Sequence, residues 1–327
     1  MYMSKLTLRA AISKGLEEAL SSDENVFLLG EDIGEYGGAY AVTKGLLDKF
    51  GEKRVRDMPI AESVIAGTAI GSSMVGLRPI VEIMTINFTL LAMDQIVNHG
   101  AKIRHMSNGQ LSAPFILRTV TGGGGGLAAT HSQSLEGWYA NVPGLIVVTP
   151  SNPYDALGLL RSCLESRDPV IYVEHCLLYS EIAEVPEEYY TVPVGKSVVC
   201  REGKDVTIVT YSAMVRVCLE AADELSKYGI EAEVIDLRSL RPLDTETSAK
   251  SLMKTGRAVV VEENWKTGGF GAEISSSLHE NAFDFIESPI IRIAAEEVPI
   301  PYSRNLESNV IPDSSKVVNK IKAMFEI

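Results

Sequence analysis

Glu62 is a carboxylate set among apolar and small side chains, which is an unusual place for an acid. It lies in the run Asp57-Met58-Pro59-Ile60-Ala61-Glu62-Ser63-Val64-Ile65-Ala66-Gly67, and the residues from there to Gly76 are mainly Ala, Gly, Ser, Val, Ile and Met. This composition predicts a helix that is packed tightly on all sides. An acid that opens such a helix either complements the helix dipole or lies in a dry site that disfavours its ionised form. In the second case Glu62 could share a proton near neutral pH.

His131 follows a run of five glycines, Gly122 to Gly126. The run lacks the Gly-Lys-Ser/Thr ending of a phosphate loop, and residues 147–150 lack the acid that a dinucleotide fingerprint places about 20 positions later. The glycines therefore predict a mobile or closely packed loop that leads to His131, because glycine permits backbone conformations that other residues avoid. A lone histidine is usually structural or exposed, but an imidazole can also stabilise a carboxylate or move protons.

A strand that ends in an aromatic residue supplies further candidates. The segment Ile80-Val81-Glu82-Ile83-Met84-Thr85-Ile86-Asn87-Phe88 reads as a buried strand, and a helix is expected from about Thr89 to His105. On this pattern alone, Phe88 is explained equally well as a core residue and as a ring platform for a ligand. Glu31 can likewise be explained without a functional role as an acid on a loop, and Asp94 as an acid on the surface of a helix.

Short apolar strands alternate with helices along the first part of the chain. The segments rich in apolar and β-branched residues are 26–29, 80–84, 115–118, 145–148 and 170–173. Continuous apolar strands that are separated by helices predict a parallel sheet covered on both faces. Asn152 and Pro153 provide an N-cap and a favoured first residue for a helix expected over 154–165.

After residue 173 the alternation stops and then resumes. Residues from about 177 to 204 are mixed in character and include Pro186 and Pro193, which is typical of a connector that runs over the surface. A second set of elements follows, with strands expected at 206–210, 232–236, 258–261 and 290–293, and helices near 213–227, 244–253, 272–281 and from 314. We therefore expect two consecutive α/β domains, at 1–184 and 204–327, joined by a connector at 185–203.

The composition excludes several classes of protein. The 327 residues are 22% charged and 46% hydrophobic, and the net charge of −13 argues against nucleic-acid binding because no basic patch is visible. Four widely spaced cysteines and five scattered histidines suggest no metal site. The amino terminus has no apolar run of signal-peptide length, and no stretch reaches the roughly 18–20 apolar residues that a membrane span needs. We expect a cytoplasmic protein, or the mature form of a mitochondrial or plastid one.

Three motifs, taken in order, resemble the beta subunits of thiamine-diphosphate-dependent 2-oxo acid dehydrogenases. These subunits belong to the decarboxylating components of the pyruvate, branched-chain and acetoin dehydrogenase complexes. The motifs are Pro59-Ile60-Ala61-Glu62, Glu82-Ile83-Met84-Thr85-Ile86-Asn87-Phe88 and Ala129-Thr130-His131-Ser132-Gln133-Ser134. The resemblance extends from Thr7-Leu8-Arg9-Ala10-Ala11, through Leu28-Leu29-Gly30-Glu31-Asp32-Ile33-Gly34, to Val298-Pro299-Ile300-Pro301-Tyr302. It implies a pyrimidine-binding domain followed by a transketolase-type C-terminal α/β domain.

The resemblance also implies a role for each candidate residue. Glu62 hydrogen-bonds the ring nitrogen of the cofactor's pyrimidine, which drives the pyrimidine amino group to the imino form that removes the thiazolium proton. His131 stabilises the substrate carboxylate or the intermediate and moves protons during acyl transfer. Phe88 stacks on the pyrimidine, and Met84 lines the same pocket. The family places two more acids near a water-filled passage between paired active sites, and these match Glu31 and Asp94.

Two motifs that the family uses for the rest of the cofactor are absent. The family holds the diphosphate and its Mg²⁺ with Gly-Asp-Gly followed by Asn-Asn or a close variant, and no Gly-Asp or Asn-Asn pair occurs in this sequence. The resemblance therefore implies that this chain supplies the pyrimidine half of a thiamine diphosphate site. An alpha subunit supplies the other half and holds the Mg²⁺, in an α₂β₂ heterotetramer. The second implied partner is a core acyltransferase whose lipoyl group accepts the acyl unit.

Three alternatives stay open for the reaction. Pyruvate is the expected substrate, and acetoin or a branched-chain 2-oxo acid is the nearest alternative. Arg118-Thr119-Val120-Thr121-Gly122 and Glu174-His175 occur in acetoin and pyruvate enzymes alike, so they do not decide between them. A split transketolase-like half would transfer a ketol unit without a lipoyl group. A non-catalytic scaffold subunit is disfavoured because Glu62 and His131 are both intact.

Overall fold

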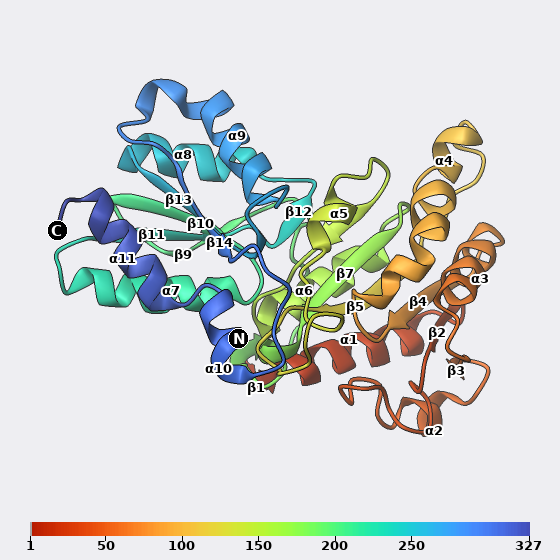
Figure 1. Ribbon diagram of the computed structural model, residues 1–327. Helices are drawn as coiled ribbons and strands as arrows, with labels where there is room; N and C mark the ends of the chain where they lie inside the picture. The colour runs from red at the N-terminus through yellow and green to blue at the C-terminus, as the bar shows by residue number, and fades with distance from the viewer. Residues whose placement is uncertain (1) are drawn as a thin grey trace. The chain divides into compact units, whose positions relative to one another are not determined.

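The computed structural model describes residues 2–327, which form two compact units. The first unit contains the residues up to Thr121 together with Trp138–Val194, and the second contains Gly122–Gly137 together with Gly195–Ile327. Each unit has its own sheet with helices packed on it (Figure 1). The expected fold class, two consecutive α/β domains, is confirmed.

The limits of the two units differ from the expected domain limits in two places. Gly122–Gly137, expected within the first domain, groups with the second unit. The expected connector at 185–203 is divided between the units, and it contains strand β9 (Val198–Arg201), which pairs antiparallel with β11 (Ala232–Asp236). β9 is a half-exposed strand at the edge of its sheet, so it lacks the continuous apolar run that identifies an inner strand.

The main sheet of the first unit is parallel, with its strands in the order β6-β7-β5-β4-β2-β3. The strands are β2 (Val26–Gly30), β3 (Val55–Asp57), β4 (Arg78–Ile83), β5 (Ile116–Thr121), β6 (Ile146–Val148) and β7 (Val170–His175). All except the short β3 lie where a strand was expected. A separate antiparallel pair is formed by β1 (Met3–Thr7) and β8 (Ile182–Pro186).

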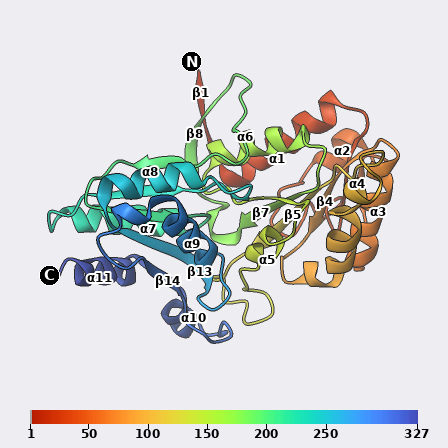
Figure 2. The ribbon, with the colours of Figure 1, turned by 90° about the horizontal axis from the view of Figure 1, so that it is seen from above.

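Helices cover both faces of this sheet, as predicted (Figures 1 and 2). α1 (Leu8–Ser22) and α6 (Pro153–Leu164) pack against each other on one side, and α3 (Glu62–Met74) packs on β4 from the other. α6 has the predicted cap, because the Asn152 side chain accepts a hydrogen bond from the Asp155 N–H at 2.9 Å. Shorter helical segments include α2 (Leu46–Phe50), α5 (Glu136–Ala140) and the 3₁₀ turn η3 (Cys176–Leu178).

α3 begins at Glu62, as expected, but within this chain it is not packed on all sides. One row of positions, spaced by three or four residues and therefore on one face of the helix, is exposed. We call this row the exposed α3 face, and it consists of Val64, Thr68, Gly71 and Val75. Val64 is 53% exposed and Val75 is 80% exposed. Apolar and small residues occur on every face of the helix, so composition alone could not separate the buried face from this one.

The single helix expected from about Thr89 to His105 was a wrong prediction. The chain forms a 3₁₀ segment η1 (Phe88–Ala92), a π-helical segment η2 (Gln95–Gly100) and the short α4 (Ile103–Met106). At the end of η2 the Ala101 N–H donates to the carbonyl of Ile96, five residues back, at 2.9 Å. Apolar spacing predicts that a segment is helical, but it does not distinguish these hydrogen-bond registers.

The second unit contains a sheet with the order β14-β13-β10-β11-β9, in which only β9 is antiparallel to its neighbour. Its other strands are β10 (Val206–Thr210), β13 (Ala258–Trp265) and β14 (Ile291–Ala295). The unit also contains the short strand β12 (Ser239–Arg241), which is not part of this sheet. Figure 1 shows α8 (Thr245–Thr255) and α9 (Gly271–Ala282) on one face of this sheet, and α7 (Met214–Ser226) and α11 (Ser314–Met324) on the other. The 3₁₀ turn η4 (Phe283–Phe285) and α10 (Arg304–Val310) complete the unit.

Candidate active site

Three acids of the first unit are brought together at the carboxyl ends of its strands. β2 pairs in parallel with both β3 and β4, so that Gly30 lies opposite Asp57 on one side and Glu82 on the other. Segments that leave parallel strands emerge at the same edge of the sheet, which is where α/β proteins bind their ligands. Glu31 directly follows β2, Glu82 lies near the end of β4, and Glu62 opens α3 after β3.

Glu62 is buried and does not cap its helix. Only 4% of its surface is exposed, and the N-cap position belongs to Ala61, which makes no side-chain capping bond. Among residues 2–327, no side chain or backbone N–H donates a hydrogen bond to the Glu62 carboxyl group. The carboxyl group therefore has an acceptor that no described group of the chain uses, and a polar group of a ligand could engage it.

Glu31 lies beside Glu62 and is also buried. It is 6% exposed, and its Oε1 is buried without a hydrogen-bond partner. Burial raises the pKa of Glu31 to about 7, with further contributions from the negative charges of Glu62, Asp32 and Glu82. A carboxyl group with this pKa can gain or lose a proton near neutral pH, which suits it to proton exchange at the site.

Replacing Glu31 by Gln should raise the stability of the chain at high pH and change it little at low pH. The carboxyl ionises near pH 4.5 when it is unperturbed and near 7 in the folded chain. The folded state therefore binds more protons between these values, so this residue makes stability fall as the pH rises through that window. The measurement is the difference in Tm between Glu31→Gln and the wild type, which should increase from about pH 5 to about pH 8.

The control for this experiment is Glu35→Gln, which changes an exposed acid on the loop after β2. Its effect on Tm should not vary systematically across the same pH range. A Glu31→Gln effect that stayed constant, or that shrank with increasing pH, would contradict the assigned pKa and its cause.

A buried charge network crosses the sheet next to these acids. The Arg118 side chain, on β5, contacts Glu82 Oε2 through Nη1 at 2.7 Å and both carboxylate oxygens of Glu174, on β7, at 2.7 and 2.9 Å. The Tyr179 hydroxyl donates to Glu174 at 2.6 Å. Burial alone would lower the pKa of Arg118, but Glu174 and Glu82 outweigh it and raise the pKa, so the guanidinium stays charged. The sequence pattern gave these residues no site role, although charged residues inside apolar strands were a usable signal.

Arg118→Met should destabilise the chain by about 3–5 kcal/mol, because it leaves two buried carboxylates without their cation. The matched control is Arg104→Met, which removes the exposed 2.8 Å ion pair between Arg104 and Asp168. That change should cost less than about 1 kcal/mol. Urea unfolding of both variants gives the comparison. Equal losses in the two variants would show that the network contributes no more than a surface pair.

The remaining candidates of the first unit differ in their surroundings. Met84 and Phe88 are half-buried and follow directly on β4, at the same edge of the sheet as the three acids. Asp94 is different, because its side chain is 66% exposed. It accepts a hydrogen bond from Asn98 at 2.7 Å and lies 3.6 Å from His99. Within this chain Asp94 has the surroundings of a surface acid.

His131 belongs to the second unit. Its side chain is exposed, and its Nδ1 lies 2.9 Å from the Thr130 hydroxyl. The structure thus groups Glu31, Glu62 and Glu82 with Met84 and Phe88 at one sheet edge, and it places His131 on the glycine-rich segment of the other unit.

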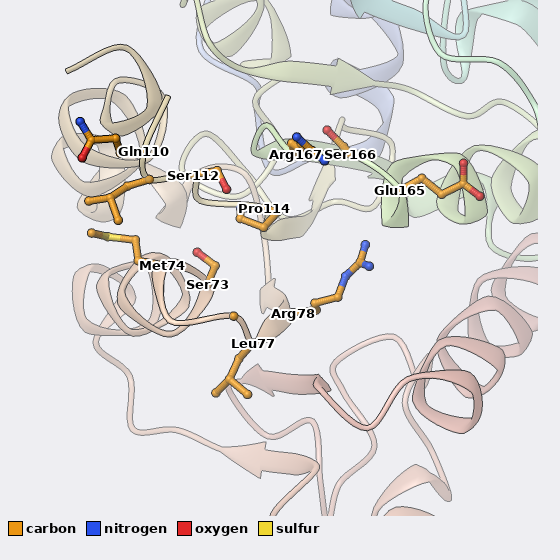
Figure 3. Close-up of a pocket in the computed structure, with 12 residues that line it drawn as sticks. Ser73, Met74, Leu77, Arg78, Gln110, Ser112, Pro114, Glu165, Ser166 and Arg167 are labelled. Atoms are coloured by element: carbon orange, nitrogen blue, oxygen red, sulfur yellow. The ribbon is translucent and has the colours of Figure 1, made fainter. Parts of the chain in front are cut away.

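A pocket of about 390 Å³ lies elsewhere in the first unit (Figure 3). Its lining comes from the end of α3, the start of β4, and the segments before β5 and β7, and it includes Arg78, Gln110, Ser112 and Arg167. These elements place it at the amino-terminal edge of the sheet. Parallel α/β sheets bind ligands at the carboxyl ends of their strands, so the acids at that end form the better candidate site.

Two general properties of the described chain bear on the type of site. Within residues 2–327, no three His, Cys, Asp or Glu side chains are arranged to hold a metal ion. None of the helices in that range is both long enough and apolar enough to cross a membrane.

Comparison with known families also divides the chain into two parts. Residues 4–181 match the family model of the transketolase pyrimidine binding domain, and residues 195–317 match that of the transketolase C-terminal domain. The first match contains all the acids described above, and together the two matches cover most of the chain.

Curated relatives align with nearly the whole chain. The pyruvate dehydrogenase E1 component subunit beta-2 of rice mitochondria is 48% identical over 97% of this chain and 86% of its own length. The mitochondrial subunit beta of cattle is 45% identical, over 99% of this chain and 91% of its own. The bacterial subunit beta of Rhizobium meliloti is 43% identical, over 98% of this chain and 70% of its own.

Solved structures show the same architecture. An inactive beta4 tetramer of a split-gene transketolase superposes with a TM-score of 0.78 at 26% identity, over 97% of both chains. Transketolase from Campylobacter jejuni gives a TM-score of 0.71 at 16% identity, over 98% of this chain and 47% of that one. Because the Campylobacter jejuni enzyme is only 16% identical, its similarity concerns the fold alone.

Proposed function

Because this chain belongs to the family of beta subunits of the pyruvate dehydrogenase E1 component, we propose that it works with an alpha subunit in the oxidative decarboxylation of pyruvate. The acetyl unit then passes to the lipoyl group of a core acyltransferase. The observation that carries this proposal is the buried Glu62 beside Glu31, whose Oε1 is buried without a hydrogen-bond partner, at the carboxyl ends of β2 to β4.

The residues at this edge fit the pyrimidine part of thiamine diphosphate. The cofactor, when bound, supplies carbanion chemistry at the 2-oxo group of the substrate. Glu62 would hold a proton at the pyrimidine ring nitrogen, in the place where its carboxyl group has no donor in this chain. The half-buried Phe88 would present its ring to the pyrimidine, and Met84 would fill the space beside it. The carboxyl group of Glu31, whose pKa is about 7, would exchange protons with groups around Glu62.

His131 would act on the substrate side of the reaction. Its imidazole is exposed on the glycine-rich segment. It would stabilise the carboxylate of the 2-oxo acid and move a proton during acyl transfer to the lipoyl group. Asp94 would contribute to an acidic passage only after a partner chain covered it.

The alpha subunit would supply the diphosphate and Mg²⁺ contacts, since this sequence contains no Gly-Asp and no Asn-Asn pair. The exposed α3 face supports such a partner. It starts two residues after Glu62. It exposes Val64 on the helix and Val75 directly after it, whereas the other face of the helix is buried. A shared active site needs a large permanent interface, and an α₂β₂ heterotetramer provides one. Relatives from mitochondria and from a bacterium support the mitochondrial matrix or a bacterial cytoplasm as the location.

The test of this function is a substrate comparison on the chain co-expressed with the alpha subunit of the same organism. We expect carbon dioxide release from pyruvate and acetylation of a lipoyl domain, with slower reactions of branched-chain 2-oxo acids and acetoin. The split-gene transketolase relative defines the other candidate function, ketol transfer between sugar phosphates without lipoyl. Ketol transfer with no activity on pyruvate would overturn the proposal in favour of that alternative.

A further inference from the structure

The five-glycine run is bound to the second unit by two carboxylates. The Gly123 N–H donates to Glu263 Oε1 at 2.6 Å. The N–H groups of Gly124 and Gly126 donate to the two oxygens of Glu307, at 2.8 and 3.0 Å. Glu263 lies on β13 and Glu307 on α10, and both are buried. We call these three hydrogen bonds the carboxylate clamp.

The clamp explains why this segment consists of glycines. Gly122, Gly124 and Gly126 have positive φ values of 92°, 87° and 69°, which are strained for other residues. A Cβ on Gly123 would lie 2.7 Å from Ile311 Cδ1, so a side chain at that position would require Ile311 to shift. Successive N–H groups in such a backbone make a concave anion site. In most loops of this kind a phosphate fills the site, but here the protein's own carboxylates fill it.

The other end of the segment is also held by the second unit. The Gly122 N–H donates to the Gln133 carbonyl at 3.4 Å, which closes the base of the loop. Ser132 and Ser134 are buried, and they line one small cavity with residues 263–265 of β13. His131 is therefore an exposed residue between a clamped glycine run and a buried anchor.

We propose that Glu263 and Glu307 are positioning residues, which fix the backbone of the glycine run and thereby the location of the His131 imidazole. The inference rests on the proposed function of His131. In this role neither carboxylate touches substrate or cofactor. Glu307 accepts from two glycine N–H groups and Glu263 accepts from one. Charge-assisted bonds of this kind are stronger than neutral ones, so removing one should loosen the loop measurably.

The first test measures the order of the loop in the assembled enzyme with its alpha subunit. Glu307→Gln keeps the size of the side chain, but it places an NH₂ group opposite one glycine N–H. Hydrogen–deuterium exchange of peptides that cover 122–131 should become at least about tenfold faster. The matched control is Glu297→Gln, which alters an exposed carboxylate that accepts the Thr267 N–H at 2.7 Å in the same unit. Exchange of 122–131 should not change in the control.

The second test asks whether the carboxylates act through His131. We expect single-turnover acetyl transfer to a lipoyl domain to be about tenfold or more slower in Glu307→Gln, while the Kd for thiamine diphosphate changes less than about threefold. Combined with His131→Ala, Glu307→Gln should add less than about threefold, because residues that act as one unit are not additive. Glu263→Gln should behave in the same way, which provides a second variant if Glu307→Gln does not assemble.

The outcomes separate the inference from the function that it rests on. Unchanged exchange in Glu307→Gln overturns the clamp, whatever happens to activity. Faster exchange with normal acetyl transfer, or fully additive losses in the double variant, overturns the positioning role. Normal acetyl transfer in His131→Ala overturns the proposed role of His131 itself, while the exchange data still report on the clamp.

Discussion

Purified without a partner, this chain should bind thiamine diphosphate and Mg²⁺ negligibly and should not decarboxylate pyruvate. The physical reason is that the diphosphate carries most of the cofactor's charge, and the sequence contains no Gly-Asp and no Asn-Asn pair to hold it with the metal ion. The acids at the carboxyl ends of β2 to β4 would also repel a diphosphate. Isothermal titration calorimetry on the isolated chain measures the affinity directly.

The control for that experiment is the same chain co-expressed with its alpha subunit, in which binding and activity should both appear. A micromolar Kd for the isolated chain would contradict the half-site interpretation. The inactive beta4 tetramer of the split-gene transketolase indicates that a related chain can fold without being active, so loss of activity alone would not imply misfolding. Circular dichroism of the isolated chain separates these two causes.

Glu62→Gln should abolish most of the turnover of the assembled enzyme. Gln keeps the size of the side chain but cannot share a carboxyl proton with a ring nitrogen. Positioned acid–base groups typically contribute about 10²–10⁴-fold, and we expect a loss in that range. Assembly and cofactor affinity should be largely preserved, because the diphosphate and Mg²⁺ contacts are proposed to lie on the other chain.

The matched control for Glu62→Gln is Glu24→Gln, which changes an exposed acid just before β2. It lies at the opposite edge of the same sheet, and it should leave turnover unchanged. A simple first-turn acid at position 62 would give a different pattern. Its loss would cost about 0.3–1 kcal/mol of stability through the helix dipole and would leave the chemical step intact.

The inner strands and the main helices could be predicted because residues that are close together in the sequence determine each of them. β4, β5 and β7 are continuous apolar runs, and parallel strands buried on both faces have this pattern. The cap of α6 depends on Asn152 and Pro153, which are neighbours. Element type and approximate position follow from such local signals.

The buried contacts could not be predicted, because their partners are far apart in the chain. Arg118 is 36 residues from Glu82 and 56 from Glu174, and the three meet only because β5 lies between β4 and β7. The carboxylate clamp joins residues 140 and 183 positions apart. The glycine run therefore gave no local signal of its partners, which lie on β13 and α10.

The most direct test of the central claim is the exchange rate of the thiazolium proton in the assembled Glu62→Gln enzyme. The sample is mixed rapidly with deuterium oxide, quenched with acid at several times and read by proton NMR of the released cofactor. This measurement isolates the step that Glu62 is proposed to drive from substrate binding and from acyl transfer. We predict exchange slower than wild type by about 10²-fold or more. Wild-type exchange in a variant that binds cofactor normally would contradict the assignment of Glu62.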